Sequence, residues 1–120
     1  MKLAVTSQGN NLQSPLDPRF GRAKFFIVVD TETNAFSAVD NVVNLNAAQG
    51  AGIQAGKRVA ELGVKDLITG HVGPKAFSIL RAAGVRIHTG ASGTVAEVLE
   101  QFKTGELPAA ASPDVEGHWA

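Results

Sequence analysis

Short apolar runs of strand length alternate with segments of helical periodicity along most of this chain. Strands are predicted for Lys2–Ser7 and Phe25–Asp30, which are rich in apolar and β-branched residues, and for residues 35–40, which return after a polar turn. Two further short runs, residues 66–69 and 85–88, bring the number of predicted strands to five. This alternation predicts one layered α/β domain.

Three segments have the spacing of helices. The clearest spans residues 94–102, where apolar side chains recur at i, i+3, i+4 and i+7. Residues 49–62 form a second predicted helix that Gly63 ends, and Pro74 opens a third that continues to about residue 83.

The order of these elements predicts the topology of the sheet. A hairpin follows the first strand, and the later strands each follow a helix, so right-handed crossovers should run them parallel to the first strand. We therefore predict a mixed five-stranded sheet of order 3-2-1-4-5, with strand 2 antiparallel and helices on both faces. Residues 1–107 form the predicted domain, and residues 108–120, which contain acidic residues and no Lys or Arg, form a loose acidic tail.

Composition excludes several classes of function. The chain has no cysteine, which excludes disulfides, thiolate zinc sites, conventionally ligated iron–sulfur clusters and cysteine nucleophiles. The formal net charge is zero, and the small positive excess before residue 104 is too weak for a general nucleic-acid binder. No apolar run approaches the roughly 18 residues of a membrane span, so we expect no membrane association and a cytoplasmic location.

Cations gather in residues 17–24, which read DPRFGRAK and follow the first strand. Arg19 and Arg22 suit a ligand with delocalised negative charge, because guanidinium is planar, permanently charged and rich in donors. Gly21 permits a tight bend, and Phe20 either anchors the loop in the core or faces a ligand. As an alternative, the arginines form surface ion pairs with nearby aspartates.

Two more glycine-bearing loops follow later strands. Ligands in open α/β sheets collect beyond the carboxyl ends of parallel strands, so we expect all three loops to converge on one pocket. The loop before Pro74 would direct free amides and the positive end of a helix at an anion, although plain strand-to-helix geometry explains its glycines equally well. The candidate binding residues are Ser7, Arg19, Phe20, Gly21, Arg22, Gly70, His71, Val72, Gly73, Lys75, Gly90, Ser92 and Gly93.

His71 and His88 have different predicted roles. His71 follows a strand end in a glycine-bearing loop, where it could coordinate a metal, donate a hydrogen bond to an anion, or have no role. His88 ends a strand and is predicted to be structural.

These loops, together with Gly50-Ala51-Gly52, resemble the dinitrogenase iron–molybdenum cofactor biosynthesis family over roughly residues 2 to 107. The resemblance implies a ribonuclease H-like fold and cofactor binding at the first loop and the His71 loop. It also implies a molybdenum–copper sulfide cluster held without covalent attachment, as in a small stand-alone member of the family, or alternatively the iron–molybdenum cofactor or its precursor. Many members have histidines where this chain has Arg19 and Arg22, so electrostatic capture replaces coordination from that loop.

The predicted function is non-enzymatic carriage or storage of a preformed anionic molybdenum-containing sulfide cluster. The expected partners are a cofactor-accepting protein or, as the resemblance implies, a partitioning-type ATPase. One alternative is a phosphate or nucleotide sensor that acts through such an ATPase. Another is a metal-dependent phosphodiesterase built on Asp30, Asp40 and Asp66, although these belong to no recognisable acidic motif.

Overall fold

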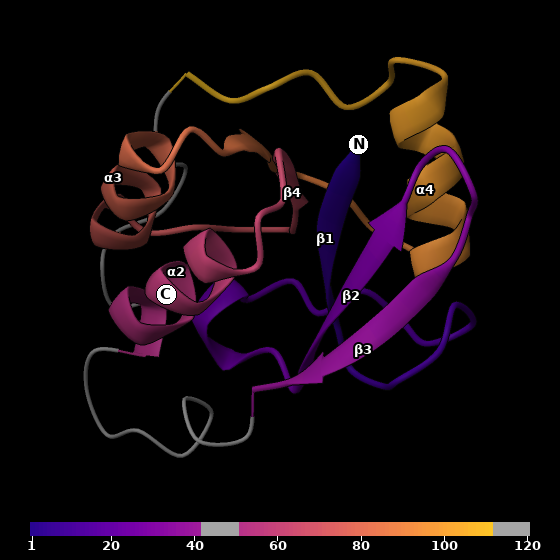
Figure 1. The fold of residues 1–120 in the computed structure, drawn as a ribbon, viewed down its shortest axis with the longest axis horizontal. Coiled ribbons are helices and arrows are strands. Elements are labelled where there is room, and N and C mark those ends of the chain that lie inside the picture. Colours follow the sequence, from indigo (N-terminus) through magenta and orange to yellow (C-terminus); the bar gives the residue numbers. More distant parts are fainter. Residues whose placement is uncertain (42–50, 112–120) are drawn as a thin grey trace.

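Five strands form the sheet that the sequence predicts, in a computed structural model that describes residues 1–41 and 51–111 (Figure 1). The spatial order is β3-β2-β1-β4-β5. Strand β2 pairs antiparallel with β1 and β3, whereas β4 is parallel to β1 and β5 is parallel to β4. The predicted order and the antiparallel direction of strand 2 are therefore confirmed. The strands are β1 Lys2–Ser7, β2 Phe25–Asp30, β3 Phe36–Asp40, β4 Asp66–Ile68 and β5 Arg86–His88.

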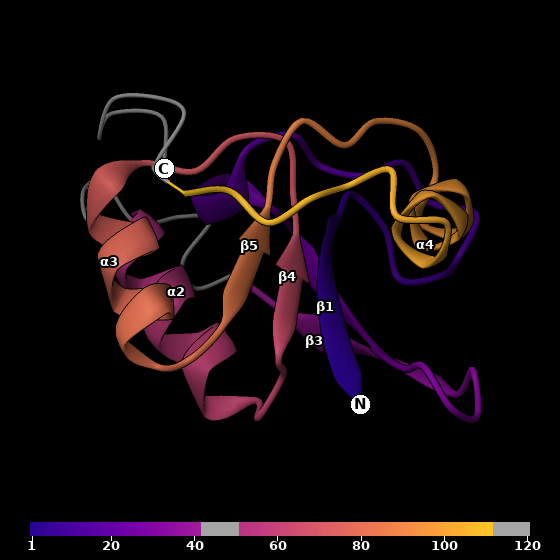
Figure 2. The same cartoon turned by 90° about the horizontal axis from the view of Figure 1, so that it is seen from above.

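Helices cover both faces of this sheet, also as predicted. Figure 2 shows α2 (Ala51–Glu61) and α3 (Pro74–Ala82) on one face and α4 (Val95–Lys103) on the other. The sequence did not reveal η1, a single 3₁₀ turn at Phe20–Arg22. The predicted part of helix α2 before residue 51, including Gly50, lies outside the described residues.

The sheet separates two apolar clusters, because alternate residues of a strand point to opposite faces. On β1, Leu3 and Val5 pack with the α4 residues, whereas Ala4 packs with α2 and α3. On β4, Ile68 joins the α4 side and Leu67 the other side. Over the described residues, no helix combines the length and the apolar content that crossing a membrane requires.

After α4 the chain crosses the outer edge of β5, in a segment that we name the strap (residues 104–111; Figure 2). Leu107 packs against the cluster on the α4 side, and Ala110 packs against the cluster on the α2–α3 side. The backbone N–H of Ala110 donates to the carbonyl of Ile87 over 2.7 Å. The chain is thus attached to the sheet as far as residue 110. A domain boundary after residue 107 and an acidic tail remain predictions, and residues 112–120 lie outside the described part.

A hydrogen-bonded network around the buried Asp66 carboxylate anchors the strap. The Asp66 carboxylate, with 1% of its side chain exposed, accepts from Arg86 Nε and a terminal guanidinium nitrogen, each at 3.0 Å, and lies 2.8 Å from His88 Nε2. The other ring nitrogen, Nδ1 of His88, lies 2.6 Å from the carbonyl oxygen of Leu107. The His88 ring also meets Phe102 of α4 edge-on, with 5.1 Å between ring centres. His88 therefore has the structural position that the sequence predicts, joining β4, β5, α4 and the strap.

We expect Asp66→Ala to lower the free energy of unfolding by about 3 kcal/mol or more, because it leaves the buried His88 without its carboxylate partner. Urea unfolding measures this loss. Glu61→Ala, which removes an exposed carboxylate, serves as the control and should change stability by no more than about 0.5 kcal/mol. A loss below about 1 kcal/mol for Asp66→Ala would show that the network does not hold the strap.

Candidate anion-binding site

The first loop (residues 8–24) and the second loop (residues 69–73) are joined by a short parallel bridge. The His71 N–H donates to the Pro18 carbonyl over 2.7 Å, and the Phe20 N–H donates to the His71 carbonyl over 3.2 Å. Arg19 and His71 are therefore direct backbone partners, although they are far apart in the sequence.

The third loop (residues 89–93) is hydrogen-bonded to both of the others. Leu16 donates its backbone N–H to the Gly93 carbonyl over 2.8 Å, and Gly90 donates to the Gly70 carbonyl over 2.9 Å. All three loops leave the carboxyl ends of the mutually parallel strands β1, β4 and β5. The three loops therefore lie together, as predicted, whereas a pocket formed between them stays a prediction.

Gly70 is needed for a reason that differs from both sequence interpretations of the loop glycines. A Cβ atom built on Gly70 would lie 2.7 Å from Pro18 Cα and 2.7 Å from the Pro18 carbonyl oxygen. These atoms belong to backbone that the Arg19–His71 bridge holds in place. Close packing between the first and second loops therefore requires glycine here, independently of any ligand.

The first loop buries its aromatic residue. Phe20 is fully buried, and its ring centre lies 5.9 Å from that of Phe26, so it anchors the loop in the core, which is one of the two roles left open by the sequence. Gly21 is buried, Arg22 is half-buried and Arg19 is exposed. The ring of Phe20 therefore does not line an open surface.

Asp17 shapes the loop rather than neutralising it. Its Oδ1 accepts a hydrogen bond from the backbone N–H of Arg19 over 3.0 Å. Among the described residues, no carboxylate forms an ion pair with the Arg19 guanidinium. The proposed alternative, an ion pair between Arg19 and a nearby aspartate, is thus not found in this part of the chain.

Hydroxyl groups at the ends of β1 and β4 support the first loop from below. Ser7 is fully buried, and its Oγ donates to the Gly9 carbonyl over 2.7 Å. Thr6 Oγ1 donates to the Asp17 carbonyl over 2.7 Å and lies 2.9 Å from Thr69 Oγ1. The Thr6–Thr69 pair was not identified from the sequence, although each residue lies within one position of the end of β1 or β4.

The second loop leads into α3, whose first backbone amides have no side-chain cap among the described residues. Gly73 is the N-cap, Pro74 occupies the first turn, and that turn contains no acidic residue. Lys75 is exposed, His71 is half-buried, and Val72 is fully buried in the core. The positive end of the α3 dipole is therefore reinforced by a cation.

The third loop leads into α4, whose first backbone amides are capped by side chains, unlike those at the start of α3. Thr94 Oγ1 accepts from the Glu97 N–H over 3.2 Å, and Glu97 Oε1 accepts from the Thr94 N–H over 3.0 Å. These hydrogen bonds from Thr94 hold the pKa of Glu97 below its ordinary value. The Glu97 carboxylate thus already places a negative charge at the start of α4.

The candidate residues of the third loop remain accessible. Gly90, Ser92 and Gly93 are exposed, and both glycines have positive φ, 79° and 109°. Their backbone groups could contact a ligand, but the adjacent Glu97 carboxylate disfavours an anion on this side. The side of α3 is therefore the electrostatically favourable half of the site.

Protein metal ligands are sparse. Within residues 1–41 and 51–111, no three His, Asp or Glu side chains come together as a metal site would require. In the sheet register Asp30 lies opposite Lys2 and Asp66 opposite Leu3, at the amino end of β1 and away from the three loops. Asp40 pairs with Phe25, which lies opposite Ser7 at the carboxyl end of β1. The three carboxylates considered for phosphodiesterase chemistry are thus divided between opposite ends of the sheet and are not assembled in one place.

We expect Gly70→Ala to lower the free energy of unfolding by about 1–3 kcal/mol, because the added methyl group collides with the Pro18 backbone. Gly56→Ala is a useful contrast, since its methyl group would approach the Ile79 side chain at 3.3 Å and the Ala76 backbone at an ordinary contact distance of 3.7 Å, and the helix would gain propensity. Urea unfolding of both variants tests the difference. Equal stability of the two variants would contradict close packing of the loops.

Three comparisons identify relatives of the whole fold. The apo form of the orange protein from Desulfovibrio gigas is 43% identical, with a TM-score of 0.92, covering 95% of this chain and 96% of that chain. A candidate NifB protein from Thermotoga is 35% identical, with a TM-score of 0.82, covering 97% of this chain and 98% of that one. An uncharacterized protein of Methanocaldococcus jannaschii is 28% identical over 109 residues, which is 89% of each chain.

The family model described as dinitrogenase iron-molybdenum cofactor matches residues 1–105, a range that includes strands β1 to β5 and helices α2, α3 and α4 of the described part of the chain. The match includes the three loops that converge at the carboxyl edge of the sheet. This chain therefore belongs to the dinitrogenase iron–molybdenum cofactor family.

Proposed function

We propose that this chain binds a preformed, anionic, molybdenum-containing sulfide cluster without covalent attachment, and that it carries or stores the cluster rather than transforming it. Membership of the cofactor family supports molybdenum as a component. The absence of cysteine supports a cluster that brings its own sulfide ligands, since the chain offers no thiolate.

Support for the anion comes chiefly from the bridge between Arg19 and His71. This bridge fixes the cationic first loop beside the start of α3, where the first turn has free amides, a lysine and no acidic residue. A polyanionic cluster could accept hydrogen bonds from those amides and from guanidinium at the same time. Glu97 at the start of α4 would direct the cluster toward the α3 side.

The cluster that we favour is a molybdenum–copper sulfide, with the iron–molybdenum cofactor or its precursor as the alternative. Arginines in the first loop favour electrostatic holding over coordination, since guanidinium is not a metal ligand. A carrier needs a protein that accepts the cluster, and we propose such an acceptor, or a partitioning-type ATPase, as the partner.

A second candidate is a phosphate or nucleotide sensor, because an uncapped helix start with an adjacent lysine also suits phosphate. Thermal-shift measurements with nucleotides, phosphate and tetrathiomolybdate separate the two functions, since a ligand stabilises the fold according to its occupancy. Stabilisation by the thiometallate alone supports a cluster carrier. Stabilisation by nucleotides alone would replace it with the sensor.

Reconstitution with tetrathiomolybdate and copper tests the proposal directly. We expect a coloured protein-bound species that survives desalting, and we expect Arg19→Ala combined with Arg22→Ala to lose it, because both cations of the first loop are removed. The matched control is Lys2→Ala combined with Lys65→Ala, which removes two exposed cations at the amino ends of β1 and β4, opposite the three loops.

The two double variants distinguish the possible results. Loss of colour in the arginine variant, with normal folding and with colour retained by the lysine variant, supports the first loop as the binding element. A colourless wild-type protein, or equal retention by both variants, would contradict it.

His71 provides a separate test of how the cluster is held. If the ring donates a hydrogen bond to cluster sulfide, His71→Ala should weaken binding by about tenfold, because a hydrogen bond to a charged group contributes about 1.5 kcal/mol or more. His71→Gln retains an N–H donor and should recover most of this loss. Cluster titrations followed by absorbance give both affinities, and a glutamine variant as weak as the alanine variant would indicate metal coordination instead.

A further inference from the structure

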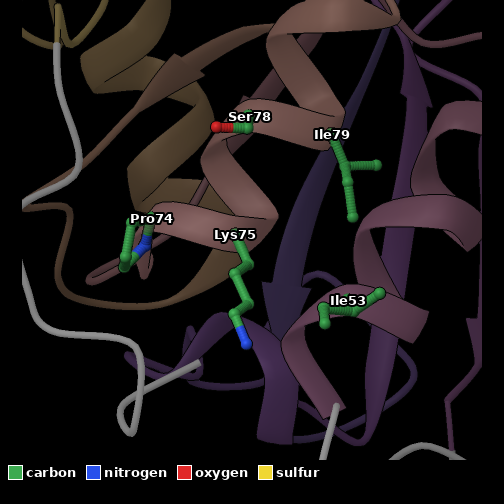
Figure 3. A pocket seen from close by; sticks show the side chains of 5 residues that line it. All are labelled: Ile53, Pro74, Lys75, Ser78 and Ile79. Carbon is green, nitrogen blue, oxygen red and sulfur yellow. The ribbon is translucent and has the colours of Figure 1, made fainter.

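An apolar groove lies between α2 and α3 and begins at Pro74 and Lys75, directly after the second loop. Ile53 of α2 and Pro74, Lys75, Ser78 and Ile79 of α3 line a hollow of about 440 Å³ (Figure 3). Ile53 and Ile79 are half-buried, so part of their apolar surface faces solvent. Lys75 is the charged residue of this lining. The α2–α3 groove therefore suits an occupant with an apolar side chain and a nearby negative charge.

The strap leads the chain to the same side of the sheet as this groove. Leu107 packs on the α4 side, but three residues later Ala110 packs against the cluster that contains Phe77 and Leu80 of α3. The hydrogen bond from Ala110 to the Ile87 carbonyl fixes this crossing at the outer edge of the sheet. The described chain thus ends on the α2–α3 side.

The next residues have the chemistry that the groove requires. Residues 112–120 read SPDVEGHWA and contain two carboxylates, one tryptophan and no Lys or Arg. Trp119 is the eighth residue after Ala111, and an extended segment of eight residue steps spans up to about 27 Å. The whole domain measures 35 × 28 × 24 Å, so this reach is comparable with the dimensions of the domain.

We propose that residues 112–120 dock in the α2–α3 groove of the same chain, with Trp119 against the apolar lining and the acidic residues near Lys75. Burial of an indole ring gives a large apolar contribution. Carboxylates near the first turn of α3 gain from its lysine and from the helix dipole. A second copy of the chain has the same chemistry, but the strap delivers these residues to the groove without the entropic cost of association.

Tryptophan fluorescence reports this docking directly, since Trp119 is the one tryptophan and the chain has no tyrosine. In the full chain we expect emission that is blue-shifted from that of N-acetyltryptophanamide and shielded from acrylamide. Ile79→Asp should shift the emission to that of the free model compound. Lys75→Glu should shift it in the same direction, and Asp114→Lys combined with Glu116→Lys should reverse that effect by restoring charge complementarity.

Phe36→Asp is the matched control, because Phe36 is an exposed aromatic residue on β3, away from the groove. It should leave the emission unchanged, and circular dichroism checks that each variant is folded. Lys75→Glu changes an exposed side chain, so it tests docking even if Ile79→Asp does not fold.

Three results would overturn the proposal. The first is emission from the full chain that matches the model compound. The second is a blue shift that neither groove variant alters. The third is a blue shift that disappears on dilution, which would assign the groove to residues 112–120 of another copy. Both proposals use Lys75 and the start of α3, but none of these fluorescence readings uses a bound anion, so the test of docking does not depend on the outcome of the cluster reconstitution.

Discussion

The backbone bridge between Arg19 and His71 is the interaction on which the rest of the site depends. It joins a loop that follows the first strand to a loop that follows the fourth, with hydrogen bonds of 2.7 and 3.2 Å. Gly70 permits the close approach, and Phe20 fixes the other side of the bridge in the core. The fold thus uses buried packing to hold exposed cations in a defined position, which reduces the ordering cost of binding a ligand there.

The starts of α3 and α4, which both lie at the carboxyl ends of the parallel strands, differ in their electrostatic environment. The start of α4 satisfies its own amides through the reciprocal hydrogen bonds of Thr94 and Glu97, whereas that of α3 has an adjacent lysine and no acidic residue in its first turn. An anion at the junction of the loops would therefore experience attraction from one side and a carboxylate on the other. Because of this asymmetry, an anion at the junction of the loops should bind closer to α3 than to α4.

Much of the fold could be predicted from the sequence, because strand and helix periodicities are local and crossover handedness then restricts the topology. The convergence of the loops followed from the same topology. The roles of individual loop residues could not be predicted in the same way. Phe20 and Val72 are buried. The Ser7 hydroxyl donates its hydrogen bond to the Gly9 carbonyl, and position 70 must be glycine because a Cβ atom there would collide with the Pro18 backbone. Each role depends on a partner that is distant in sequence or on a backbone contact with no periodic pattern. The strap was missed for the same reason, since its contacts with His88 and Ile87 are tertiary.

The central claim is that a cluster with its own sulfide ligands is held by cations and amides rather than by protein ligands to the metal. X-ray absorption at the molybdenum edge of the loaded full chain tests this most directly. The predicted result is a first shell with sulfur ligands and no scattering from an imidazole ring. A nitrogen shell with imidazole scattering, lost in His71→Gln, would contradict non-covalent holding and would make His71 a ligand.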